Sequence, residues 1–132
     1  MTVAEGGCYC GSIRYSISGE PLSSGICHCR SCRKIAAAPR LPFITFMLDQ
    51  FRFTKGAPIA FHSSSPVTRS FCGRCGTPLT YRHADYPDRL DIMSCSLDDP
   101  ERFPPNHHLW VSHKLDWDRI VDELAIHETL PK

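Results

Sequence analysis

The sequence contains no long apolar segment. None of its apolar runs approaches the roughly 18 residues that a membrane-spanning helix needs. The opening residues, MTVAEGG, also lack the apolar core of a secretory signal. We therefore expect no membrane partner and no export, and we place the protein in the cytoplasm, where thiols stay reduced.

The sequence also lacks an excess of charge of either sign. Its 15 Lys and Arg and 14 Asp and Glu leave a formal net charge of +1. Domains that bind nucleic acid by bulk electrostatics are usually clearly basic, so this balance disfavours a nucleic-acid partner while leaving room for a local basic patch. No repeat, low-complexity tract or linker divides the 132 residues, which suit a single domain over 1–132.

Long regular elements are not expected either, because 11 prolines and eight glycines cut the chain into short segments. Between them, alternating or continuously apolar segments indicate strands over residues 12–17, 41–47, 51–54, 59–62, 67–71, 79–82 and 90–94. One short helix is expected over 117–124, where apolar residues recur at helical spacing. The sequence thus predicts a mainly β fold of six to eight short strands with little helix.

Cysteine, by contrast, is abundant, with eight residues. In a reducing compartment this number favours metal binding over disulfides. The pairs Cys8/Cys10 and Cys27/Cys29 have the spacing Cys-x-Cys, at which a disulfide closes only a strained ring. Both thiolates of such a pair can bind one tetrahedral metal ion without that strain.

Two of the cysteine motifs together form a complete ligand set. Gly7-Cys8-Tyr9-Cys10-Gly11 lies near the start, and Cys72-Gly73-Arg74-Cys75-Gly76 lies far downstream. The flanking glycines let the backbone bend around an ion, and zinc prefers four such ligands in a tetrahedron. We predict a structural zinc bound by Cys8, Cys10, Cys72 and Cys75. The alternative is four buried cysteines without a ligand.

The remaining motif, Cys27-His28-Cys29-Arg30-Ser31-Cys32, holds three thiols within six residues. Three ligands without an evident fourth are typical of a catalytic zinc, which keeps one position open. Such a zinc binds a substrate thiol as its thiolate or polarises a carbonyl. The neighbouring cations Arg30, Arg33 and Lys34 are candidates for binding substrate carboxylates.

Two other interpretations of this motif stay open. His28 or Cys95 completes the set and makes a second structural zinc, or the three thiols are reduced and metal-free. On a strand, the His28 side chain points to the face opposite Cys27 and Cys29, which favours a core or supporting role. Cys95 is expected to be a small core residue.

Two further groups of residues carry simpler expectations. Trp110 and Trp117 are interpreted as core residues. His107 and His108 are expected to have structural or surface roles rather than to shuttle protons near a zinc.

Four segments, taken in order, resemble the glutathione-dependent formaldehyde-activating enzyme family, which also includes centromere protein V. They are GGCYCGSIRYSI, ICHCRSCRK, RSFCGRCGTPLTY and SCSLDDPERFPPNHHLWVSHKLDW, and they extend from Gly6 to Trp117. The resemblance implies a zinc-stabilised β-tent fold of stacked antiparallel sheets. It implies a structural zinc on Cys8, Cys10, Cys72 and Cys75, and a second zinc on Cys27, Cys29 and Cys32 beside which glutathione binds.

The resemblance also implies an activity and shows one departure. Family members are described as carbon–sulfur lyases that join formaldehyde to glutathione as S-hydroxymethylglutathione. Many carry a Ser/Thr-Gly motif after the third cysteine of the second cluster, where this chain has Ile35-Ala36-Ala37-Ala38. Alanine lacks both the hydroxyl group and the conformational freedom of glycine.

These observations lead to two hypotheses of function. The first is a zinc-dependent carbon–sulfur lyase that binds glutathione or a similar thiol and adds it to a small aldehyde such as formaldehyde. Cys27, Cys29 and Cys32 would then be the catalytic cluster. The second is a non-catalytic, zinc-stabilised module that binds a protein or nucleic-acid partner. A carrier that binds without turnover and a homo-oligomeric assembly also remain open.

Overall fold

The computed structural model describes residues 3–131, and within them the chain is built mainly of short strands. The strands are β1 (Val3–Gly7), β2 (Arg14–Ser18), β3 (Ser23–Cys27), β4 (Leu41–Met47), β5 (Phe51–Lys55), β6 (Ile59–Ser64), β7 (Val67–Phe71), β8 (Pro78–His83), β9 (Arg89–Met93), β10 (His107–Leu109) and β11 (Ala125–Ile126). The α-helix α1 covers Arg30–Ala36, and short 3-10 helices cover Leu48–Gln50, Ser94–Ser96 and Val111–His113.

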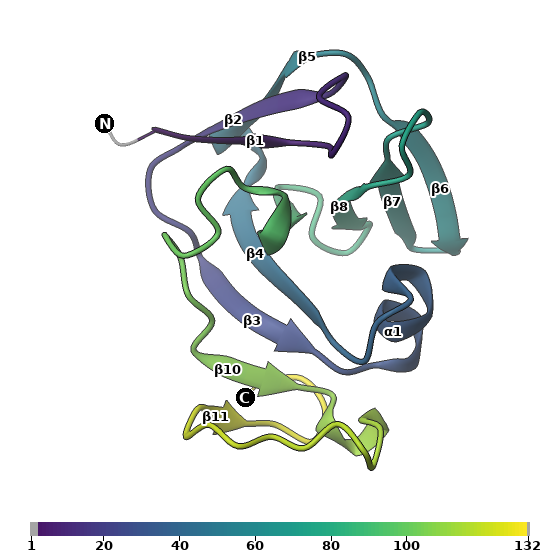
Figure 1. Cartoon of the computed structure of the whole chain (residues 1–132), viewed down its shortest axis with the longest axis vertical. Coiled ribbons are helices and arrows are strands. Elements are labelled where there is room, and N and C mark those ends of the chain that lie inside the picture. The colour runs from purple at the N-terminus through teal and green to yellow at the C-terminus, as the bar shows by residue number, and fades with distance from the viewer. Residues whose placement is uncertain (1–2, 132) are drawn as a thin grey trace.

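The strands form two sheets (Figure 1). The small sheet has the order β1-β2-β5, and the large sheet has the order β11-β10-β3-β4-β9-β8-β7-β6. All pairs are antiparallel except β3 with β10 and β10 with β11, which are parallel. The expected antiparallel architecture is therefore confirmed, with a parallel addition at the edge of the large sheet that the C-terminal part of the chain supplies.

The core lies between the two sheets. Tyr15 and Ile17 of β2 pack with Ile44 of β4, Leu79 of β8 and Ile92 of β9, and each of these side chains is at most 1% exposed. Ile44 and Ile92 are cross-strand partners, so they point to the same face of the large sheet. The opposite face of that sheet carries the next residues along the strands, Thr45 and Asp91.

The expected strands are confirmed with small shifts at their ends, but their number was underestimated. Residues 41–47 and 67–71 match β4 and β7 without change. The sequence missed β1, β3, β10 and β11, which brings the number of strands in the described residues to eleven. β1 ends in two glycines and β3 begins with two serines and a glycine, and such residues carry little strand signal.

The helix expected over 117–124 is wrong, because that segment has no regular structure. The expectation that Trp117 is a core residue is wrong as well, since Trp117 is 71% exposed and Val121 is 90% exposed. Two carboxylates of the segment make its contacts with the rest of the protein: Asp118 receives hydrogen bonds from Arg40, and Asp122 bonds His108. The half-buried Arg40 and the buried His108 thus fix this segment, and Trp117 and Val121 are left at the surface.

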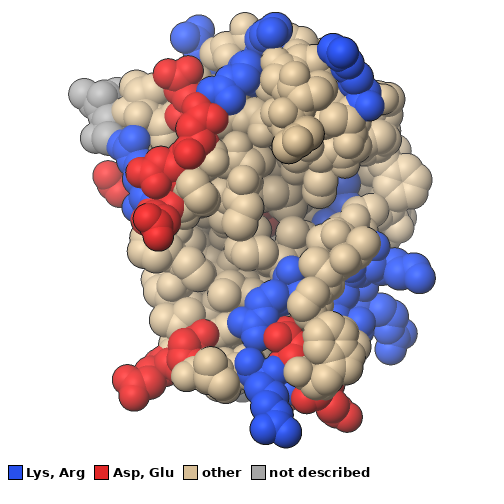
Figure 2. Space-filling view, viewed as in Figure 1, with Lys and Arg blue, Asp and Glu red and all other residues tan. Residues whose placement is uncertain are grey.

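The surface carries charges of both signs. In Figure 2, acidic side chains gather at the upper left, and basic side chains gather at the lower right, around the position of α1 in Figure 1. No continuous basic stripe crosses this face. None of the described helices is long and apolar enough to span a membrane.

Candidate metal centres and active site

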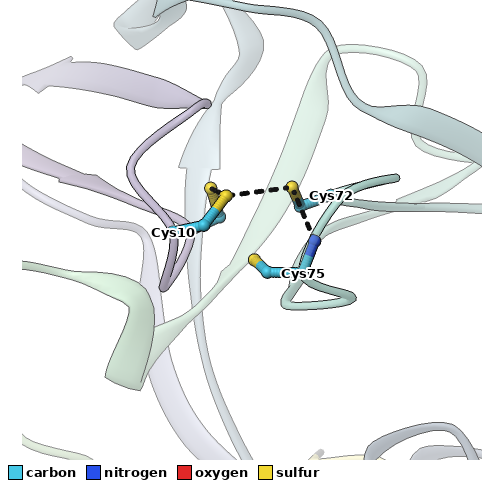
Figure 3. Close-up of side chains that lie close together, drawn as sticks. Cys10, Cys72 and Cys75 are labelled. Atoms are coloured by element: carbon cyan, nitrogen blue, oxygen red, sulfur yellow. Dashed lines mark hydrogen bonds between the residues drawn. The ribbon is translucent and has the colours of Figure 1, made fainter.

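The first cysteine cluster joins the two sheets. Cys8 and Cys10 lie in the turn between β1 and β2 of the small sheet, and Cys72 and Cys75 lie in the turn between β7 and β8 of the large one. The sulfurs of Cys10, Cys72 and Cys75 face one another across the gap between these turns (Figure 3). All four sulfurs lie within 4.8 Å of one another.

The spacing of these sulfurs fits zinc and excludes a disulfide. The distance from Cys8 Sγ to Cys10 Sγ is 3.6 Å, and the distance from Cys10 Sγ to Cys72 Sγ is 3.8 Å. A disulfide bond is about 2.05 Å long. A tetrahedron with zinc–sulfur bonds of about 2.3 Å has edges of about 3.8 Å. The arrangement therefore suits one four-coordinate ion.

Backbone and hydroxyl groups around this cluster support thiolates. The Ile13 amide donates to Cys8 Sγ at 3.3 Å, and the Arg74 amide donates to Cys72 Sγ at 3.3 Å. The Thr77 hydroxyl lies 3.2 Å from Cys75 Sγ, and this hydrogen bond lowers the pKa of Cys75 to about 5. Hydrogen bonds to the charged form stabilise it, so the site is prepared for negatively charged sulfur.

The second cluster lies where β3 leads into α1. Cys27 is the last residue of β3, Cys29 is the N-cap of α1, and Cys32 lies in its first turn. The Cys29 sulfur accepts a hydrogen bond from the Cys32 amide at 3.4 Å. The three sulfurs lie within 4.8 Å of one another. The sequence missed α1 because seven residues are too few to show a helical period.

The electrostatics of the second cluster favour a shared negative charge. Hydrogen bonds from the Cys27 and Cys32 thiols lower the pKa of Cys29 far below its ordinary value, and the pKa of Cys27 is raised by its contact with Cys29. One thiolate therefore forms readily, while the two further thiols resist ionisation without a cation beside them. A bound divalent metal ion would supply that cation.

No fourth cysteine, histidine or carboxylate joins this group within residues 3–131. The alternative in which His28 or Cys95 completes the set is therefore not supported. His28 is fully buried and bonds another histidine. Cys95 is exposed, so the expectation that it is a core residue is wrong.

The cations predicted to bind substrate occupy two kinds of position. Arg30 and Lys34 are exposed on α1, and their side chains reach solvent. Arg33 is partly buried, and its Nε donates to the carbonyl oxygen of His28 at 3.2 Å. Their part in binding a substrate stays a prediction.

A buried polar chain lies behind the second cluster. His28 Nε2 and His108 Nδ1 are 2.8 Å apart, and His108 Nε2 lies 3.1 Å from both oxygens of Asp122. Both rings are 0% exposed, and burial lowers the pKa of His28 to about 4. The expected structural role of His108 is thus confirmed, and the chain fixes the strand that carries Cys27 against the C-terminal segment.

The sequence missed Arg69, which contacts the second cluster. Arg69 lies on β7, is 7% exposed, and its Nη2 lies 3.8 Å from the Cys32 sulfur. One sequence signal was available: Arg69 is two positions from both Val67 and Phe71, and residues two apart on a strand share one face. A charge on such a face needs a nearby group of opposite charge or a ligand.

Two hollows flank α1. The smaller, of about 120 Å³, lies between Ile35 of α1 and strands β6 to β8, and Arg69 lines it. The larger, of about 380 Å³, lies between the end of α1 and the first cluster and includes Arg40 and Cys95. Met93 and Pro78 line both hollows, so the two adjoin.

The fold and the two clusters define a mainly β protein with one group of four cysteines that joins the two sheets and one group of three cysteines at the start of α1. A family model described as "Glutathione-dependent formaldehyde-activating enzyme" matches residues 3–113. The chain belongs to this family. The resemblance noted from the four sequence segments is confirmed.

Two individual proteins extend this comparison. The chain is 30% identical over 128 residues to a Halomonas elongata protein named "Putative glutathione-dependent formaldehyde-activating enzyme", covering 88% of this chain and 80% of that protein. The crystal structure of a Rhodobacter sphaeroides protein superposes with a TM-score of 0.63 at 18% identity, covering 93% of this chain and 98% of the other. At that identity the likeness shows the shared fold.

Proposed function

We propose that this protein is a zinc-dependent enzyme that adds a thiol, glutathione or a similar compound, to a small aldehyde. The observation that carries the proposal is the second cluster, whose three sulfurs have no fourth ligand among the described residues and lie beside α1 and its two hollows. Family membership supports glutathione and formaldehyde as the substrate classes. The closed first cluster has the chemistry of a structural site.

The proposed roles of the residues follow from where they lie. Cys27, Cys29 and Cys32 would hold the catalytic zinc, which when bound supplies a Lewis acid that keeps a substrate sulfur as its thiolate. Arg30, Arg33 and Lys34 would bind the carboxylates of the thiol substrate. The larger hollow, at about 380 Å³, is within the size range of small-ligand sites, and we assign the thiol to it.

The reaction needs no oxidant or reductant. The sulfur attacks the carbonyl carbon and a carbon–sulfur bond forms. The π electrons of the carbonyl move to its oxygen, which takes up the proton that the thiol released. The product is a hydroxyalkyl thioether, and the reverse direction is the lyase reaction.

The first test is the zinc content of the purified protein, compared with its Cys29→Ser and Cys95→Ser variants. We expect two zinc ions per chain in the parent and in Cys95→Ser, whose exposed thiol lies outside both clusters. Cys29→Ser should fold, keep one zinc, and lose the acceleration of thiol addition above the uncatalysed rate. An unchanged rate in Cys29→Ser would refute the proposed role of this cluster.

A further inference from the structure

Arg69 is a buried cation whose guanidinium is only partly engaged by the protein. Its Nε donates to the Ser63 hydroxyl at 3.2 Å, its Nη2 lies 3.8 Å from the Cys32 sulfur, and its guanidinium carbon lies 5.0 Å from the centre of the Tyr81 ring. These contacts hold the group in one place. Among the described residues no carboxylate forms a salt bridge with it.

The remaining nitrogen, Nη1, is open to a ligand. No described residue forms a hydrogen bond with it. Within residues 3–131, His28 Nδ1 is the one fully buried side-chain nitrogen or oxygen without a partner. Nη1 is therefore not sealed off, and Arg69 lines the smaller hollow. Arg69 thus lines this cavity and also contacts the second cluster through the Cys32 sulfur.

The smaller hollow suits a small molecule with one charged group. Its volume of about 120 Å³ is roughly that of four water molecules at about 30 Å³ each. Ile35, Phe61 and Met93 supply apolar walls. The hydroxyls of Ser70 and Thr80 bond each other, which leaves Arg69 as the charged residue of the lining.

Formaldehyde makes little use of this cavity. Formaldehyde is neutral and fills a small part of the volume, whereas the free Nη1 of a guanidinium held in one orientation can donate a charge-assisted hydrogen bond to a carboxylate. An aldehyde that carries a carboxylate directly beside its carbonyl would place its charge on Arg69. Its reactive carbon would then lie toward Cys32 and the rest of the second cluster.

We propose that Arg69 makes this protein selective for an aldehyde that bears a carboxylate directly on its carbonyl carbon, which is glyoxylate. The inference rests on the proposed thiol addition and names its second substrate. The thiol sulfur forms a bond to the aldehyde carbon, the carbonyl oxygen takes the thiol proton, and the carboxylate is unchanged. Arg69 binds and orients the substrate and takes no part in the proton transfer.

The test compares glyoxylate with methylglyoxal, a neutral aldehyde of nearly the same size, in the zinc-loaded protein with glutathione. The loss of one charge-assisted hydrogen-bonded contact corresponds to roughly ten- to hundred-fold in rate or affinity. We expect Arg69→Gln to lower kcat/KM for glyoxylate by that factor and to change the value for methylglyoxal by less than about three-fold. Arg69→Lys should retain part of the preference.

The matched control is Arg82→Gln, on the neighbouring strand β8, where the arginine is exposed and Nη2 donates to the Pro87 carbonyl. It should leave both aldehydes unaffected. Zinc content is measured for every variant. If Arg69→Gln loses zinc, or slows both aldehydes equally, Arg69 serves the cluster itself and the inference is wrong.

A titration without thiol separates this inference from the proposed function. Glyoxylate is titrated by calorimetry into the zinc-loaded parent and into Arg69→Gln. Binding that weakens at least ten-fold in the variant supports the carboxylate site, even if no aldehyde reacts faster than without protein. Equal binding by both proteins, or binding by neither, overturns the inference whatever the outcome of the rate measurements.

Discussion

Ala37 ends α1 in a conformation that is costly for alanine. Its φ of 51° and ψ of 43° are left-handed, and its amide and that of Ala38 close the helix by bonding the Lys34 and Arg33 carbonyls. An L-residue pays about 1–2 kcal/mol in this region, and glycine occupies it freely. Ala37 lies within the stretch where many family members carry a Ser/Thr-Gly motif.

The substitution Ala37→Gly should therefore stabilise the protein. The side chain is exposed, so its removal costs no packing. The relief of about 1–2 kcal/mol is offset by the greater freedom of glycine in the unfolded chain, about 0.4–1 kcal/mol. We expect a net gain of about 0.5–1 kcal/mol in the free energy of unfolding.

The matched control is Ala36→Gly, one residue earlier, where the backbone has helical dihedrals. There glycine should destabilise by up to about 1 kcal/mol. Urea unfolding with saturating zinc measures both variants, because metal binding and folding are coupled. If Ala37→Gly lowers the free energy of unfolding as Ala36→Gly does, α1 does not end in the left-handed conformation, and the argument fails.

Two further substitutions test a partly buried carboxyl group, Asp91, and an exposed one, Asp122, that bonds the buried His108. Burial raises the pKa of Asp91 to about 6, whereas an aspartate in an unfolded chain has a pKa of about 3.9. Between these two values the folded protein binds one proton more than the unfolded chain. The free energy of unfolding therefore falls as pH rises from about 4 to 6. Asp91→Asn keeps the acceptor for the Thr45 hydroxyl, and we expect it to be more stable than the parent at pH 7 by about 1–2 kcal/mol. Urea unfolding at pH 5 and 7.5 should show that this gain is smaller at the lower pH. A gain that is the same at both pH values would contradict the prediction. Asp122→Asn removes one of the two oxygen acceptors that face His108, and we expect it to speed amide hydrogen exchange in residues 115–127. The control Asp116→Asn, at an exposed position, should leave the exchange unchanged. Equal exchange rates in the two variants would show that the contact between Asp122 and His108 does not fix this segment.

The sequence predicted the members of both cysteine clusters because the pairs of cysteines are local. In Cys-x-Cys and Cys-x-x-Cys the chain itself holds two sulfurs close together, so spacing alone restricts what they can bind. The strands between these motifs were also recognisable, since residues 41–47 and 67–71 carry their apolar pattern in a few neighbouring positions. The same kind of local pattern led to the wrong helix at 117–124, because Trp117 and Val121, although at helical spacing, do not pack into the core.

What surrounds the second cluster was decided by contacts between distant parts of the chain. His28 and His108 are 80 positions apart, and Arg69 and Cys32 are 37 apart. No local pattern marks such pairs, because each becomes favourable only when the sheet has formed and the partner is already buried nearby. The sequence by itself determined which residues gather into the two clusters. Only the tertiary structure decided that one cluster closes between the sheets, while the other opens beside a buried arginine.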